Sequence, residues 1–107
     1  MRQRIEKVEK LVKELTANFL NKESSSASLI SVTYVTVSPD LKKATVYLSV
    51  LPESAEETAL LFAKRKRPEM RDYLKENMET KNIPFLEVEI DKGEKNRQRI
   101  DELLREK

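Results

Sequence analysis

The chain has 107 residues and carries 21 Lys and Arg against 19 Asp and Glu, a formal net charge of +2. This length favours one domain over residues 1–107, and so small a net charge means that only a local cluster of cations would indicate nucleic-acid binding. The sequence contains no Cys and no His, which excludes disulfides, thiolate metal sites and the commonest general base. No apolar run is long enough to span a bilayer, so we expect a cytoplasmic protein without a membrane partner.

The N-terminal segment is predicted to be a helix. Over residues 2–20 apolar side chains recur every three or four positions, which is typical of an amphipathic helix with one buried stripe. The members of this stripe are Ile5, Val8, Leu11, Val12, Leu15 and Phe19. Residues 21–28 are polar and rich in Ser, and they indicate a loop.

Two strands joined by a tight turn should follow this helix. Residues 29–37 and 44–51 alternate with a period of two, and the second strand should turn Val46 and Leu48 towards the core. The alternation slips near Thr33 or Tyr34, which predicts a β-bulge. The connection Ser-Pro-Asp-Leu has Pro39 and Asp40 at its centre, and both residue types suit a β-turn.

The second half predicts two helices and a third strand. Ser54-Ala55-Glu56-Glu57 has the spacing of a capping box that opens a helix. Pro68 should end this helix and open another, because proline lacks the amide that a helix interior needs. We expect the second helix to bring Met70, Tyr73, Leu74 and Met78 inward.

The predicted order is α-β-β-α-α-β with a short terminal helix. The third strand should cover residues 85–91, Gly93 should end it, and residues 94–105 read as a final helix. We treat residues 92–107 as a basic and acidic helical tail. Three helices over one face of a three-stranded sheet make a two-layer α+β domain.

A basic run at the predicted helix break is the first candidate binding site. Lys and Arg side chains neutralise phosphates, and a helix start attracts anions through its unpaired amides. The alternative is a solvated helix end, because cations also suit a helix C-terminus. The candidate residues for RNA binding are Lys64, Arg65, Lys66 and Arg67, with Arg71 one turn further on.

Two further basic groups are weaker candidates. Lys92, Lys95, Arg97 and Arg99 follow the third strand, but acidic residues interleave with them, so self-paired surface charge is as good an interpretation as RNA contact. Arg2 and Arg4 with Lys42 and Lys43 form the third group. The turn lysines are more simply explained as protection of a hairpin end against association.

The sequence favours neither base stacking nor catalysis. Phe19 and Phe62 fall on apolar helix stripes, and Tyr34 and Tyr47 suit cross-strand packing, so no platform of exposed rings is predicted. Recognition of shape and phosphates is the more plausible mode. Without His, Cys or a glycine-rich phosphate loop, the carboxylates do not indicate an enzyme, a metal site or a cofactor.

Four segments, in order, resemble one known family. The hairpin from Val37 to Val50, the helix start at Arg4-Ile5-Glu6-Lys7-Val8, the strand from Ile83 to Asp91 and the closing Arg99-Ile100-Asp101-Glu102-Leu103-Leu104 are similar to the corresponding parts of bacterial ribosome-binding factor A. The resemblance implies a KH-like fold. Aligned on Arg71, Lys66-Arg67-Pro68 stands where the family has Ala-x-Gly at a kink between two helices. The kink should persist here, because proline also makes one.

The resemblance also implies a function. It predicts a factor that binds free small (30S) ribosomal subunits and their 16S rRNA. It implies late maturation of the 5′ end of that RNA and a link to growth in the cold. We expect this factor to be a monomer when unbound and not an enzyme. The alternative from another class is a protein–protein interaction module that uses an exposed sheet face or edge.

Overall fold

The computed structural model describes residues 2–23 and 28–93. The predicted final helix and most of the predicted tail lie outside these residues. The described elements are α1 (Arg2–Glu23), β1 (Leu29–Val37), β2 (Lys43–Leu51), a 3₁₀ turn (Glu53–Ala55), α2 (Glu56–Arg65), α3 (Arg67–Asn77) and β3 (Phe85–Ile90). The order α-β-β-α-α-β is therefore confirmed, and α1 extends three residues beyond its predicted end.

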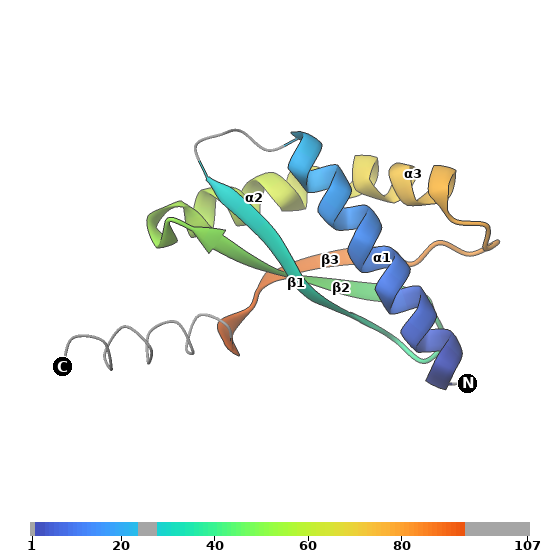
Figure 1. Ribbon diagram of the computed structural model, residues 1–107. Helices are drawn as coiled ribbons and strands as arrows, with labels where there is room; N and C mark the ends of the chain where they lie inside the picture. Colours follow the sequence, from blue (N-terminus) through green and yellow to red (C-terminus); the bar gives the residue numbers. More distant parts are fainter. Residues whose placement is uncertain (1, 24–27, 94–107) are drawn as a thin grey trace.

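The elements form two layers. The sheet has the order β1-β2-β3, in which β2 pairs antiparallel with β1 and parallel with β3. The three helices lie on one face of this sheet, and α1 crosses over β1 and β2 (Figure 1). The opposite face carries no helix among the described residues, and Tyr34 and Phe85 are exposed on it.

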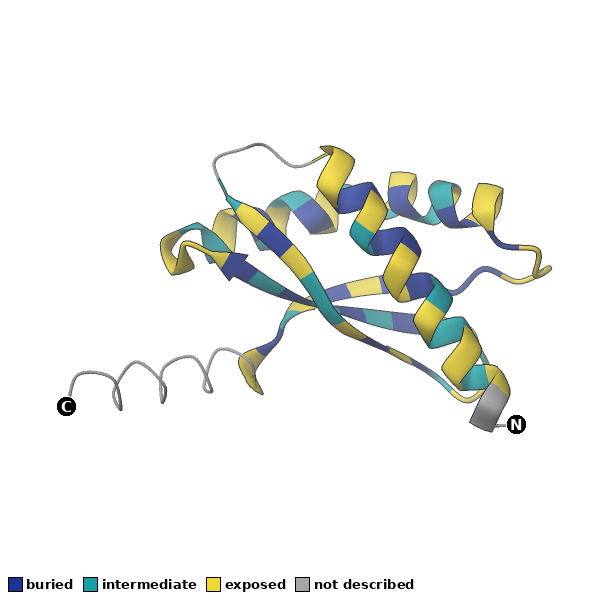
Figure 2. Ribbon diagram, viewed as in Figure 1, coloured by how far each residue is buried: buried dark blue, intermediate teal, exposed yellow. Residues whose placement is uncertain are grey.

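The core lies between the sheet and the helices, and β2 runs through its centre. Ala44, Val46, Leu48 and Val50 are buried, and the residues between them are less so, which confirms the predicted face (Figure 2). Leu48 is completely inaccessible to solvent. The stripe of α1 packs on this face as expected, with Val12, Leu15 and Phe19 more deeply buried than Ile5, Val8 and Leu11.

The hairpin contains the predicted bulge. The register of β1 against β2 shifts between Val32 and Tyr34, and after the shift Tyr34 pairs with Tyr47. Their rings stack with centroids 4.2 Å apart on the outer face. Cross-strand packing is thus confirmed as a structural role of these two tyrosines.

The turn between β1 and β2 is held by side chains. The Ser38 hydroxyl donates to the Asp40 carboxylate at 2.6 Å, and the Lys42 amide donates to the same oxygen at 3.1 Å. The Ser38 hydrogen bond, followed by that of Lys42, lowers the pKa of the Asp40 carboxyl below its usual value. Leu41 has a φ of 62°, a conformation that favours Gly or Asn and that the sequence did not suggest.

The predicted capping box is wrong. Helix α2 begins at Glu56, with Ala55 at its N-cap and no side-chain cap hydrogen bond. The preceding 3₁₀ turn is closed by the Ala55 amide, which donates to the carbonyl of Pro52 at 2.9 Å. Ser54 lies inside that turn, one residue before the N-cap, so its hydroxyl is not at the capping position.

Candidate nucleic-acid interface

Helices α2 and α3 are separated by one residue, Lys66. Its amide donates to the carbonyls of Phe62 and Ala63, while its own carbonyl accepts the Met70 amide at 2.8 Å. Pro68 is the second residue of α3, one position later than predicted. The prediction of two helices divided near Pro68 is confirmed, and the short junction brings cations from both helices together.

A hollow of about 610 Å³ lies between this junction and β3, and we call it the junction hollow. Four of the five cations predicted at the break contribute to its wall, and two carboxylates oppose them. The lining residues are Lys64, Arg65, Arg67, Pro68, Arg71, Asp72, Phe85, Leu86 and Glu87.

Lys66, the fifth predicted cation, does not line the junction hollow. Its ammonium group pairs with the Glu69 carboxylate at 3.1 Å and lies 6.0 Å from the centroid of the Phe62 ring. Glu69 stands in the first turn of α3, and Pro68 supplies no amide there. The start of α3 is thus a poor anion site, and the side chains of the hollow are better suited to meet phosphates.

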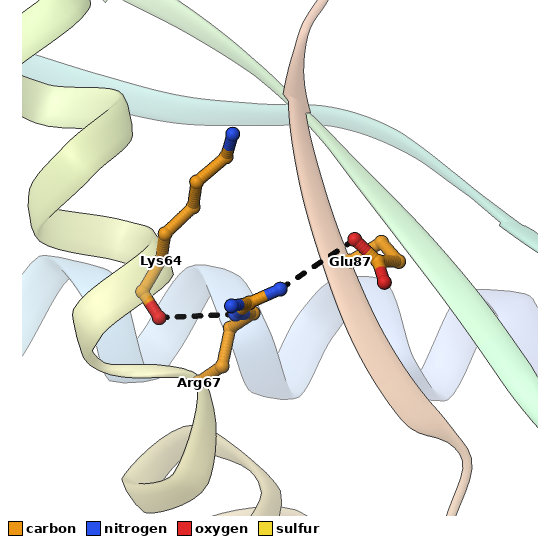
Figure 3. Close-up of polar contacts among 3 residues, drawn as sticks. All are labelled: Lys64, Arg67 and Glu87. Carbon is orange, nitrogen blue, oxygen red and sulfur yellow. Dashed lines mark hydrogen bonds and ion pairs between the residues drawn. The ribbon is translucent and has the colours of Figure 1, made fainter.

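Arg67 connects the junction to β3 (Figure 3). Its Nε donates to the carbonyl of Lys64 at 3.0 Å, and its Nη1 lies 3.5 Å from Oε2 of Glu87. The Arg67 and Glu87 side chains are 40% and 48% exposed, so the pair is weak and open to exchange with another anion. The ammonium group of Lys64 points away from this contact (Figure 3).

Arg71 has a structural role beside any binding role. Its Nη2 donates to the carbonyl of Ile83 at 3.0 Å, which ties α3 to the segment before β3. The guanidinium carbon lies 4.5 Å from the centroid of the Phe85 ring. Its Nε is buried and has no hydrogen-bond partner among the described residues.

A second basic hollow, of about 560 Å³, shares Arg71 and Phe85 with the first, and we call it the turn hollow. Lys42, Lys75 and Lys81 line it, against the single carboxylate of Asp40. Sequence reasoning gave Lys42 little weight and missed Lys75 and Lys81. The i, i+4 spacing of Arg71 and Lys75 places both side chains on one face of the helix, and this spacing could have indicated the basic cluster from the sequence.

The other predicted cations are only partly described. Lys92 is exposed and lines a separate hollow of about 480 Å³ together with Tyr34, Tyr47 and Lys64. Lys95, Arg97 and Arg99 lie outside the described residues. Arg4 and Lys43 are exposed but do not line the junction hollow.

Within residues 2–23 and 28–93, no group of three or more acidic, His or Cys side chains is placed to hold a metal ion. Across the same residues, no helix is both long enough and apolar enough to cross a membrane.

The topology of the sheet, its single helical layer and the order α-β-β-α-α-β define a KH-like α+β domain. The family model of ribosome-binding factor A matches residues 4–104, and the chain belongs to this family. The predicted family and fold class are confirmed.

Relatives of known name support this assignment. Ribosome-binding factor A of Coxiella burnetii is 32% identical over 106 residues, which are 97% of this chain and 89% of the relative. The protein of the same name from Clostridium botulinum is 33% identical over 100 residues, covering 92% of this chain and 82% of its own length.

Solved structures support the fold. The crystal structure of ribosome-binding factor A from Thermus thermophilus matches with a TM-score of 0.73 at 23% identity, covering 80% of this chain and 93% of its own. A model of the Thermus thermophilus factor fitted into a cryo-electron microscopy map of a 30S complex matches with a TM-score of 0.67 at 24% identity, over 76% and 88% of the two chains.

Proposed function

We propose that this protein binds the free small (30S) ribosomal subunit through its 16S rRNA and assists the late maturation of that RNA. It acts in the cytoplasm as a monomer and performs no chemistry itself. Membership of the ribosome-binding factor A family supports this role, and so does the structural relative that was fitted into a map of a 30S complex.

The observation that carries the proposal is the junction hollow. Lys64, Arg65, Arg67 and Arg71 line it, whereas the net charge of the whole chain is only +2. Cations gathered on one surface release counterions when they meet phosphates, which is the main source of affinity for RNA backbones. Lys64 and Arg65 are exposed, so a nucleic-acid strand has access to them.

The cations of the hollow take different parts in this proposal. Lys64 and Arg65 contact phosphates directly. Arg67 does so by exchanging its weak pair with Glu87 for a phosphate, which forms stronger, bidentate hydrogen bonds with a guanidinium group. Arg71 mainly positions the wall, because the Ile83 carbonyl and the Phe85 ring already hold it.

The remaining predicted residues have smaller parts in the proposal. Lys66 contributes little, because Glu69 already pairs with it. Lys92, together with Lys95, Arg97 and Arg99, stays a proposed second contact region.

Co-sedimentation tests the proposal directly. The protein is mixed with purified 30S subunits, with 50S subunits and with 70S ribosomes, and the bound fraction is measured as salt rises. We expect selective, salt-sensitive binding to 30S subunits. Equal binding to all three particles, or none to 30S subunits, would refute it.

The part played in maturation is tested in cells that lack the gene. We expect them to accumulate 16S rRNA with an unprocessed 5′ end, most strongly in the cold. The wild-type gene should restore processing, and a gene with Lys64→Ala, Arg65→Ala and Arg67→Ala should not. Normal 5′ ends in the deletion strain would leave subunit binding without the proposed role in maturation.

A further inference from the structure

Phe85 is an aromatic side chain in an unusual place. It is the first residue of β3 and points to the outer face of the sheet, where 66% of it is exposed. Of the large apolar side chains in the described part of the chain, it is the most exposed. Single exposed apolar residues are common on protein surfaces. A function for Phe85 must therefore be argued from the groups around it.

One face of the ring is held by Arg71. The guanidinium carbon lies 4.5 Å from the ring centroid, within the range of a cation–π contact. Arg71 is itself anchored, because it donates to the Ile83 carbonyl at 3.0 Å. This contact restricts the ring before any ligand arrives, which reduces the entropy lost on binding.

Cations flank the ring on two sides. Phe85 and Arg71 line both the junction hollow and the turn hollow, so the two hollows meet at this pair. Lys64 and Arg65 lie in the first hollow, and Lys42, Lys75 and Lys81 lie in the second. An exposed ring between positive surfaces is the arrangement by which proteins hold single-stranded nucleic acid: bases stack on the ring and phosphates follow the cations.

We propose that Phe85 is a stacking platform for one unpaired base of the RNA, whose flanking phosphates occupy the junction hollow and the turn hollow. This inference rests on the proposed function and names the form of RNA that the site takes, a single-stranded segment. It also reverses the expectation from sequence that no stacking platform exists. Because every base has a π-face, the platform holds the strand without reading base identity.

Two substitutions of Phe85 test the platform in the full-length protein. Phe85→Leu keeps an apolar side chain but removes the π-face, and Phe85→Trp keeps and enlarges it. Affinity for purified 30S subunits is measured at several salt concentrations. We expect Phe85→Leu to weaken binding by roughly 5- to 150-fold, which corresponds to one lost base stack. Phe85→Trp should bind at least as tightly as wild type.

The salt dependence separates stacking from charge. Loss of a stack leaves the slope of log affinity against log salt unchanged, because no phosphate contact is lost. Equal affinity of Phe85→Leu and wild type would overturn the platform while leaving the proposed function intact. A loss that Phe85→Trp shares, or one with a changed salt slope, would overturn it as well. If wild type itself fails to bind 30S subunits, the proposed function fails first. Circular dichroism of each variant establishes that the fold is retained.

The nature of the partner strand is tested with defined RNA. Oligoadenylate and an RNA of equal length with abasic sites carry the same phosphates, and each competes with 30S subunits for the protein. Oligoadenylate should compete better against wild type, and this advantage should vanish for Phe85→Leu. An equal advantage in both proteins would show that bases bind elsewhere. If the two RNAs compete equally well against wild type, the ring contacts no base and the platform is overturned; a ribosomal protein is then the better candidate for its partner.

Discussion

The side chains of the junction hollow should account for a measurable part of the salt dependence of subunit binding. The test variant combines Lys64→Ala, Arg65→Ala and Arg67→Ala. Each of these residues lines the hollow, and none belongs to the buried core. The fold should therefore survive, and the change should appear in binding alone.

The number of cations that engage phosphates sets the expected change in the salt slope. Each engaged phosphate contributes about 0.9 to the slope of log affinity against log salt on duplex RNA or DNA and about 0.7 on a single strand. Three engaged cations would flatten the slope by about 2 to 2.7. If Arg67 keeps its pair with Glu87 in the complex, only two engage and the change falls to about 1.4 to 1.8. Lys66→Ala alone should change little, because Glu69 already pairs with Lys66.

The assay is the affinity for 30S subunits at several salt concentrations, compared with a control of equal charge. The control combines Lys7→Ala, Lys10→Ala and Lys13→Ala, three exposed positions on α1. It also removes three positive charges, but from positions away from the hollow. If the control flattens the slope as much as the test variant, net charge rather than the hollow governs binding. An unaltered slope in the test variant would move the phosphate contacts to the turn hollow or to the region after β3.

Three further expectations concern the scaffold and the junction. Leu48→Ala should lower the free energy of unfolding by about 2–5 kcal/mol, and Ser49→Ala should change it by less than about 0.5 kcal/mol; similar effects in denaturant titration would contradict the assignment of faces. Pro68→Ala should let α2 and α3 merge, which circular dichroism would record as added helix, and should reduce 30S binding more than stability; undiminished binding with added helix would exclude the junction as the RNA site. Ser38→Ala should raise the pKa of the Asp40 carboxyl towards its ordinary value, because the hydroxyl stabilises the charged form; an unchanged value in an NMR titration would show that another group lowers it.

Local patterns in the sequence were sufficient to predict most of the scaffold. The period of two in β2, the slip near Thr33 and the break at Pro68 each report a backbone constraint on the residues themselves. The capping box predicted at Ser54 was wrong. Its residue types fit a helix start, but after Pro52 the chain first forms a 3₁₀ turn.

The candidate site was only partly predictable, because it depends on elements that are distant in sequence. The basic run is evident in the sequence. The sequence does not show that Glu69 pairs with Lys66 or that β3 forms one wall of the hollow. In the sequence, Phe85 is an ordinary strand residue. Its place at the site follows only from the sheet order, which makes β3 an edge strand beside α3. Lys75 and Lys81 joined Lys42 only when the turn, the end of α3 and the segment before β3 came together.

The Glu9 carboxylate on α1 affects whether the protein associates with other copies of itself. Oε2 of Glu9 accepts the amide of Val37 at 3.1 Å, on the side of β1 that faces away from β2. An unpaired strand edge is a template on which another chain can add a strand, and aggregation begins in this way. Here a charged side chain occupies one of the amides that such a strand would need, and the bulge at Thr33 breaks the regular spacing of the others. The β1 edge is thus protected against growth into a larger sheet, which favours a protein that stays dispersed at high concentration.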